Sequence, residues 1–363
     1  MLFYFSPLLI LLFNVLTVKL TCAKNHPELN AYLIKYSEIK KNGGWPHIKF
    51  NRVLKRGDIN SGINLIRKRL IISGDHKLIS LTCDTFNLNL EEGVKRFQYR
   101  HNLKVDGIIG IKTITAMNVP VERRIKEIET NLKRWKSFKV PADTFIFVNI
   151  AAQDLALLYH DSVILKMKII VGRETRKTQE FTAWLNEIEI NPHWIVPPGI
   201  INLDILPKLK EDCKFTESEK INVYLNHALL NPCNVYWDSI TDASSYVFVQ
   251  EPGETNPMGK IKFNFPNPHF IYFHDTPAKN LFEKETRTFS SGCIRLFDAR
   301  NLAVLLLKKD RAWNDSKLDS LIKSKENIKI PLHTAVAVSI NYFTAWVDKQ
   351  GLLMFASDIY KLD

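Results

Sequence analysis

The spacing of hydrophobic positions changes partway along this chain. Between residues 51 and 136, apolar residues recur every three or four positions, which is typical of amphipathic helices. Turns containing glycine, at 56–58 and 105–110, separate these helical stretches. After residue 145 the apolar residues form short runs or alternate with polar ones, as they do in strands. The pattern predicts an α+β protein, with a small helical unit in front of a mostly β domain.

The front of the chain divides into three segments. Residues 24–50 predict only a polar lead-in, ending in a turn at the two glycines 43 and 44. Residues 51–119 predict a compact three-helix unit. Residues 120–140 predict a linker helix, because Ile125, Ile128, Leu132 and Trp135 fall near one face and charges occupy the rest.

Residues 141–363 predict a second domain built mainly of strands. Four strands are expected at 145–150, 155–158, 165–171 and 182–190. Two helices are expected later in the domain, with Asp298 and Asp315 as their N-caps. Residues 201–246 break this rhythm with a charged run and two cysteines. We interpret this segment either as an insertion that forms a lid or as a long surface excursion. Loops of this length without a function are uncommon in compact domains.

The first residues and the net charge bear on where the protein works. Residues 1–18 carry no charge and are mostly apolar, which predicts a signal peptide cleaved after Ala23 or an uncleaved inner-membrane anchor. A lipid anchor at Cys22 fits less well, because residues 19–21 make a poor lipobox. Each interpretation exports the chain to the periplasm or cell envelope. The net charge of +12 then suggests an anionic envelope partner and no nucleic acid.

Two residues near the centre of the second domain could carry covalent chemistry. His274 ends the apolar run 270–273, and Cys293 closes the sequence Ser-Ser-Gly-Cys. A thiol is mostly protonated at neutral pH and needs a neighbouring base, which a histidine provides. Gly292 allows a sharp turn, after which the backbone N–H groups of Ser291, Gly292 and Cys293 could hold an oxyanion.

Other residues suggest how a substrate would be held. Arg295 shares a strand face with Cys293 and could bind a substrate carboxylate. Tyr272 and Trp194 could shape the pocket or simply belong to the core. Cys213 and Cys233 lie in one segment and are the expected disulfide pair, since Cys293 must stay free. No metal-ligand spacing or phosphate-binding glycine loop occurs, so no cofactor is expected.

The sequences His-Asp-Thr-Pro-Ala-Lys at 274–279 and Phe-Ser-Ser-Gly-Cys-Ile-Arg at 289–295 resemble the active-site signature of YkuD-family L,D-transpeptidases, and in particular the YcbB-like branch. The stretch Val-Asp-Gly-Ile-Ile-Gly at 105–110, in its helical context, resembles a peptidoglycan-binding domain. The resemblance implies a cysteine acyltransferase that forms a thioester on a peptidoglycan tetrapeptide, releases D-alanine and makes 3→3 cross-links.

The resemblance also sets the partners and leaves alternatives open. It implies stem peptides of the meso-diaminopimelate type as substrates and carbapenem-type molecules as inhibitors. The same cysteine chemistry ending on water would give an L,D-carboxypeptidase, and ending on a lysine of a lipoprotein would give an anchoring enzyme. A non-catalytic wall-binding protein that keeps the fold is the alternative from another class.

Overall fold

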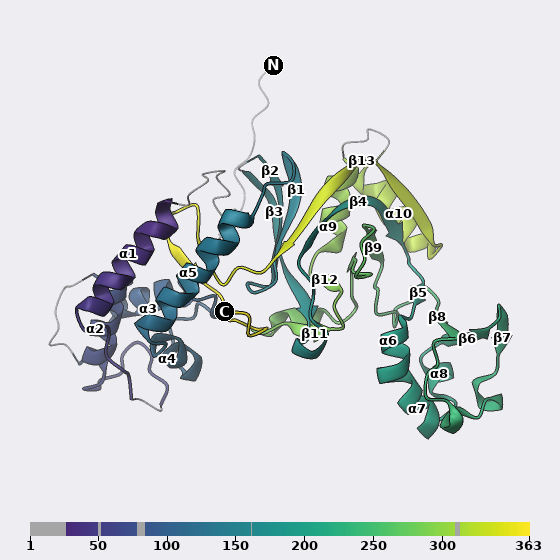
Figure 1. The fold of residues 1–363 in the computed structure, drawn as a ribbon, viewed down its shortest axis with the longest axis horizontal. Coiled ribbons are helices and arrows are strands. Elements are labelled where there is room, and N and C mark those ends of the chain that lie inside the picture. The colour runs from purple at the N-terminus through teal and green to yellow at the C-terminus, as the bar shows by residue number, and fades with distance from the viewer. Residues whose placement is uncertain (1–26, 50–51, 78–83, 161, 309–312) are drawn as a thin grey trace, which may run out of the picture.

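The computed structural model describes residues 27–49, 52–77, 84–160, 162–308 and 313–363. The predicted leader or anchor at 1–23 lies outside these ranges, as do Cys22 and Cys83. Within them, no helix is both long enough and apolar enough to cross a membrane. Figure 1 shows three parts in a row: a helical part, a central sheet and a small module at the far end.

The helical part has its own apolar core, which includes Ile66, Leu70, Leu90 and Phe97. The helix at Leu88–Arg100 begins directly after Asn87, whose side chain caps it by accepting a hydrogen bond from the N–H of Leu90. The helical fold expected before the β domain is therefore confirmed. The helices that contribute to this core are α2 (Ile63–Ser73), α3 (Leu88–Arg100) and α4 (Ile111–Met117). Two more helices, α1 (Pro27–Lys41) and α5 (Val121–Ser137), bury their apolar residues in the core of the sheet.

Helix α1 is a correction to the sequence interpretation, because residues 24–50 predict only a polar lead-in. Its buried residues are Leu29 and Tyr36, and it packs against α5. Its apolar residues are not gathered into one strong stripe, so the helix gains its stability from tertiary contacts. Helix α5 in turn joins the helical part to the sheet, where Trp135 stacks on Phe343 with ring centroids 3.8 Å apart.

The central sheet has the strand order β11-β3-β12-β10-β9-β4-β13-β1-β2. Because β2 also pairs with β3, the strands close on themselves. The strands are β1 (Thr144–Asn149), β2 (Asp154–Tyr159), β3 (Ser162–Gly172), β4 (Phe181–Ile190), β9 (Ile261–Asn264), β10 (Phe273–His274), β11 (Thr288–Ser290), β12 (Ile294–Leu296) and β13 (Ile328–Asn341).

Two further helices and a hairpin complete this domain. Helix α9 (Ala299–Leu307) is capped by Asp298, as the sequence predicts, and α10 (Asp315–Ser324) is capped by Asn314 rather than by Asp315. The hairpin of β14 (Ala345–Val347) and β15 (Leu353–Phe355) reaches the helical part. Of two short helical turns near the site, η1 (Glu174–Arg176) follows β3, and η5 (Lys279–Glu283) lies between β10 and β11.

The module at the far end, here called the insert, comprises residues 194–250. It has a separate sheet of order β5-β8-β6-β7 and its own apolar core, and the disulfide Cys213–Cys233 joins two of its turns. The insert is wider than the expected 201–246, because both flanking strands belong to its sheet. Its elements are β5 (Trp194–Ile195), α6 (Pro198–Ile200), η2 (Ile201–Ile205), α7 (Leu206–Glu211), α8 (Phe215–Ser218), β6 (Ile221–Leu225), β7 (Ala228–Leu230), η3 (Pro232–Asn234), η4 (Trp237–Ser239) and β8 (Tyr246–Gln250).

Candidate active site

Two adjacent strands place the candidate nucleophile and base side by side. Strand β10 runs parallel to β12, with His274 opposite Arg295. The N–H of Ile294 donates to the carbonyl of Tyr272, 3.1 Å away, which extends the pairing by one residue. Cys293 therefore lies at the start of one strand and Tyr272 at the start of its neighbour.

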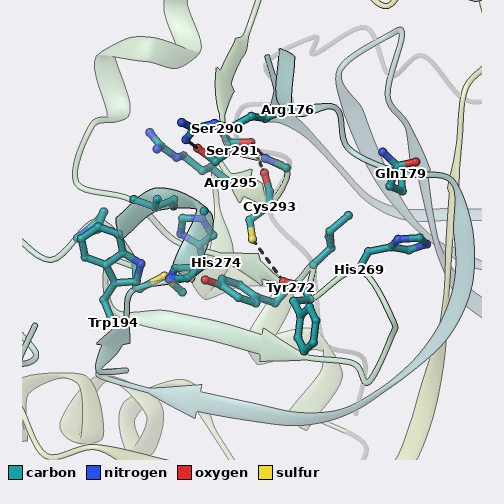
Figure 2. Close-up of a pocket in the computed structure, with 18 of the residues that line it drawn as sticks. Arg176, Gln179, Trp194, His269, Tyr272, His274, Ser290, Ser291, Cys293 and Arg295 are labelled. Atoms are coloured by element: carbon teal, nitrogen blue, oxygen red, sulfur yellow. Dashed lines mark hydrogen bonds between the residues drawn. The ribbon is translucent and has the colours of Figure 1, made fainter. Parts of the chain in front are cut away.

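The side chains singled out in the sequence line one cavity. Trp194, Tyr272, His274, Cys293 and Arg295 all contribute to a pocket of about 600 Å³ between the sheet and the insert. Figure 2 shows the thiol near the middle of this group, with Trp194 and His274 on one side. The structure thus brings together residues that are up to 101 positions apart in the chain, from Trp194 to Arg295.

The turn that carries Cys293 is held by hydrogen bonds from both sides. Gly292 has φ +118°, a backbone conformation that favours glycine. Its carbonyl accepts from Thr178 Oγ1 at 2.8 Å, and its N–H donates to Ser290 Oγ at 3.2 Å. The Gly292 N–H is therefore occupied, unlike in the expected oxyanion hole. The N–H groups of Ser291 and Cys293 have no protein acceptor among the described residues.

The segment that supports this turn needs a glycine for a second reason. At Gly172, the end of β3, a Cβ would lie 2.2 Å from the carbonyl oxygen of Arg176. Only glycine lets the chain fold back this closely. The fold-back brings Thr178 under the Ser-Ser-Gly-Cys turn, and the N–H of Arg173 donates to the carbonyl of Ser290 at 3.0 Å.

The thiol of Cys293 is half-buried and free, and it points toward the carbonyl oxygen of Phe270, 3.8 Å away. Phe270 itself is 82% exposed and has φ +54°, an unusual backbone for a bulky residue. Burial raises the pKa of the thiol, while the N–H and hydroxyl of Tyr272 act to lower it. The resting thiol is accordingly protonated at neutral pH.

His274 is almost fully buried, and its Nδ1 lies 2.6 Å from the backbone carbonyl of Asp275. Burial, followed by the nearby charge of Arg295, lowers the pKa of His274 to about 3, so the ring is neutral. The carboxylate of Asp275 instead pairs with Lys279 at 2.6 Å. No hydrogen bond joins His274 to Cys293 among the described contacts, and proton transfer between them requires the thiol to turn.

Arg295 brings a positive charge into the cavity without an acidic partner among the described residues. Its Nε is buried with no hydrogen bond, and burial lowers its pKa. An uncompensated guanidinium in a pocket favours an anionic ligand. Lys262 lies nearby, with Nζ 4.6 Å from the centre of the Tyr272 ring, and it is paired with Glu189 at 3.5 Å.

Sequence reasoning did not single out Lys262, Arg176 or Phe270. Lys262 alternates with apolar residues along β9, so its position opposite His274 follows only once strand pairing is known. Within the described residues, no group of histidine, cysteine and acidic side chains could hold a metal ion.

Residues 143–313 match the family model described as "L,D-transpeptidase catalytic domain" (YkuD). This part of the chain is a YkuD-type domain. Residues 60–117 match the model described as "Putative peptidoglycan binding domain", which places that domain in front of the YkuD-type domain. Both families agree with those that the motifs suggest, while the YcbB-like branch stays a prediction.

Among known proteins, a "Putative L,D-transpeptidase" of Haemophilus influenzae is 33% identical over 219 residues, covering 60% of this chain. This chain spans only 44% of that relative. Solved structures include an L,D-transpeptidase from Mycobacterium smegmatis, 12% identical with a TM-score of 0.28 and covering 55% of this chain and 59% of that one. An L,D-transpeptidase from Stackebrandtia nassauensis is also 12% identical, with a TM-score of 0.29 and coverage of 79% and 94%.

Proposed function

We propose that this protein is an L,D-transpeptidase that makes 3→3 cross-links between peptidoglycan stem peptides. The observation that carries this proposal is a single cavity holding a free thiol, a buried neutral imidazole and an unpaired guanidinium. A nucleophile, a base and an anion-binding group in one water-accessible pocket suit acyl transfer from a peptide that ends in a carboxylate.

In the first step, the terminal carboxylate of a tetrapeptide stem lies against Arg295, which brings the preceding amide carbonyl to Cys293. The thiol turns away from Phe270 and passes its proton to His274, and Sγ attacks the carbonyl carbon of the L-centre of meso-diaminopimelate. The N–H groups of Ser291 and Cys293 hold the oxyanion. His274 then gives the proton to the departing amine, so D-alanine leaves and a thioester remains.

The neutral state of His274 suits this sequence of proton transfers. A base that is unprotonated at rest is free to accept the thiol proton, but a pKa of about 3 makes it a weak base, so the transfer depends on stabilisation of the two charges that it creates. As the imidazolium forms, the carbonyl of Asp275 stabilises it, because this carbonyl already faces Nδ1. The hydroxyl of Tyr272 stabilises the developing charge on sulfur, and burial keeps that hydroxyl un-ionised by raising its pKa.

In the second step, the side-chain amine of a neighbouring stem attacks the thioester and forms an amide. The amine proton passes through His274 to the departing thiolate, which restores the enzyme. Water in the place of the amine would give an L,D-carboxypeptidase, and a lysine of a lipoprotein would give an anchoring reaction. The peptidoglycan-binding-type domain at residues 60–117 supports a role at the cell wall, in the periplasm or elsewhere in the envelope.

Incubation with disaccharide-tetrapeptide, followed by mass analysis of the products, tests the proposal. A cross-linked dimer together with free D-alanine is expected from the unmodified protein and not from Cys293→Ala. If tripeptide is the only product, the activity is hydrolysis rather than transpeptidation. Unchanged tetrapeptide, with a protein that also resists acylation by a carbapenem, would overturn the enzymatic proposal in favour of a wall-binding protein.

A further inference from the structure

Arg176 joins the two walls of the cavity. It ends η1, the turn that follows β3, and its Nη1 donates to Ser291 Oγ at 2.9 Å. The same guanidinium forks onto the carboxylate of Asp204 in the insert, with Nη2 3.1 Å from Oδ1 and Nη1 bound to Oδ2. One side chain thus connects the turn that carries the nucleophile to η2 of the insert, and Figure 2 shows Arg176 beside Ser291.

Both ends of this connection lie where movement would matter for acyl transfer. Ser291 is two residues before Cys293, and its N–H is one of the two expected to hold the oxyanion. Asp204 follows Leu203, which lines the cavity from the insert side and is 63% exposed. A shift of the insert is therefore transmitted to the nucleophile turn through two hydrogen-bonded contacts.

We propose that Arg176 is a positioning residue that couples closure of the insert to the geometry of the Ser-Ser-Gly-Cys turn. While Asp204 holds Arg176, the guanidinium holds Ser291, and the insert stays over the thiol. The planar fork of arginine suits this bidentate contact, and a lysine would make only a point contact. The consequence for the reaction rests on the proposed transpeptidase activity: a coupled insert excludes water from the thioester and favours amine acceptors.

The ion pair between Arg176 and Asp204 can open, because neither side chain is fully buried. The side chains of Arg176 and Asp204 are 19% and 37% exposed, so solvent screens their attraction. A contact of this strength opens readily and can close again after a substrate enters. The cavity between the sheet and the insert then alternates between access and closure without unfolding either part.

Hydrogen exchange of the whole protein, followed by peptide mass analysis, tests the coupling without any substrate. In Asp204→Asn, amides in residues 201–211 and in residues 288–296 are both expected to exchange faster, by roughly twofold to fivefold. The matched control is Asp319→Asn. Asp319 makes a bidentate, half-exposed pair with Arg300, at 2.6 and 2.8 Å, away from the cavity. This control is expected to change neither segment. Faster exchange in 201–211 alone, or in neither segment, would overturn the coupling.

A double-mutant cycle separates coupling from simple loosening. Arg176→Lys and Asp204→Asn are expected to be non-additive, both in exchange of residues 288–296 and in the ratio of cross-linked dimer to hydrolysed tripeptide. Additive effects would mean that the two residues act separately and would contradict the proposal. If the unmodified protein makes no product from tetrapeptide, the proposed function fails, and the exchange cycle alone decides whether the coupling exists.

Discussion

The helical part and the cavity that holds Cys293 place an arginine in different environments. Arg100, on α3, is 4% exposed and forms a bidentate pair with Asp75 at 2.7 and 2.6 Å, and it also donates to the carbonyl of Leu353. Arg295, on β12, has no acidic partner among the described residues and leaves its buried Nε without a hydrogen bond. A buried arginine that is paired with a carboxylate, such as Arg100, contributes to the folded structure. An arginine without such a partner, such as Arg295, is a candidate for binding an anionic ligand.

The difference extends to the groups around each arginine. Asp75 also accepts from Ser73 at 2.6 Å, so the buried carboxylate in the helical part is well supplied with donors. In the cavity, burial keeps both Cys293 and His274 uncharged by raising the pKa of the first and lowering that of the second. Substitutions in the helical part should therefore change stability, and substitutions in the cavity should change activity.

The largest effect is expected for the two residues that we propose as nucleophile and base. Cys293→Ala should remove cross-linking altogether, and His274→Ala should lower its rate by about 10²–10⁴-fold. Product analysis with tetrapeptide measures both, and circular dichroism checks that the fold is kept. Full activity in either folded variant would contradict the expectation that substitutions in the cavity change activity.

Arg100→Met should have the largest effect on stability. It leaves the buried carboxylate of Asp75 without its charge partner, at a cost of about 3–5 kcal/mol. The midpoint of urea unfolding measures the loss. The double variant Arg100→Met with Asp75→Leu should recover part of it, because no unpaired charge then remains. A single variant as stable as the unmodified protein would show that this pair is not structural.

Arg295→Met is the matched substitution in the cavity, and its effect should appear in kinetics. Loss of a charge-assisted hydrogen bond to the substrate carboxylate should raise the free-energy barrier for tetrapeptide by roughly 1.5–3 kcal/mol, which lowers kcat/KM about 10- to 150-fold. The urea midpoint should stay the same or rise. Alkylation of Cys293 by uncharged iodoacetamide should persist. An unchanged kcat/KM, or a midpoint lowered as in Arg100→Met, would make Arg295 a structural residue.

The last effect concerns pH and is confined to acidic solution. The pKa of His274 is about 3 in the folded protein and near its ordinary 6.5 when unfolded, so between these values only the unfolded chain binds the proton. Stability should then fall as pH drops below 6.5, by up to about 1.4 kcal/mol per unit from this residue. In His274→Gln the fall between pH 6.5 and 4.5 should be shallower. Equal slopes in urea titrations of both proteins would contradict the buried neutral state.

Much of the architecture could be predicted from local patterns. The strands before residue 190 and helix α9 follow from apolar spacing and an aspartate cap, and His274, Cys293 and Arg295 follow from a motif on two short segments. The disulfide between Cys213 and Cys233 agrees with the expected pairing. These features are encoded within a few neighbouring residues, which is why one sequence suffices to find them.

Features that depend on distant contacts escaped prediction. Helix α1 is stabilised by packing on α5, and its own sequence shows little apolar stripe. Asn314 takes the capping role expected of Asp315, a shift of one residue at a helix boundary. The occupied N–H of Gly292 and the contact of Arg176 with Asp204 arise only when separate loops meet. No local pattern carries that information.

In the proposed reaction, Cys293 carries the acyl group of a peptidoglycan stem. The most direct measurement is a rapid acid quench of the protein with a tetrapeptide whose diaminopimelate side-chain amine is acetylated, so that it acts only as a donor, followed by peptide mapping. We expect the peptide containing Cys293 to gain the mass of a tripeptide acyl group, labile to hydroxylamine as a thioester is, with one D-alanine released for each group bound. An adduct on any other residue, or turnover with no adduct in unmodified protein and equal turnover in Cys293→Ala, would contradict the account.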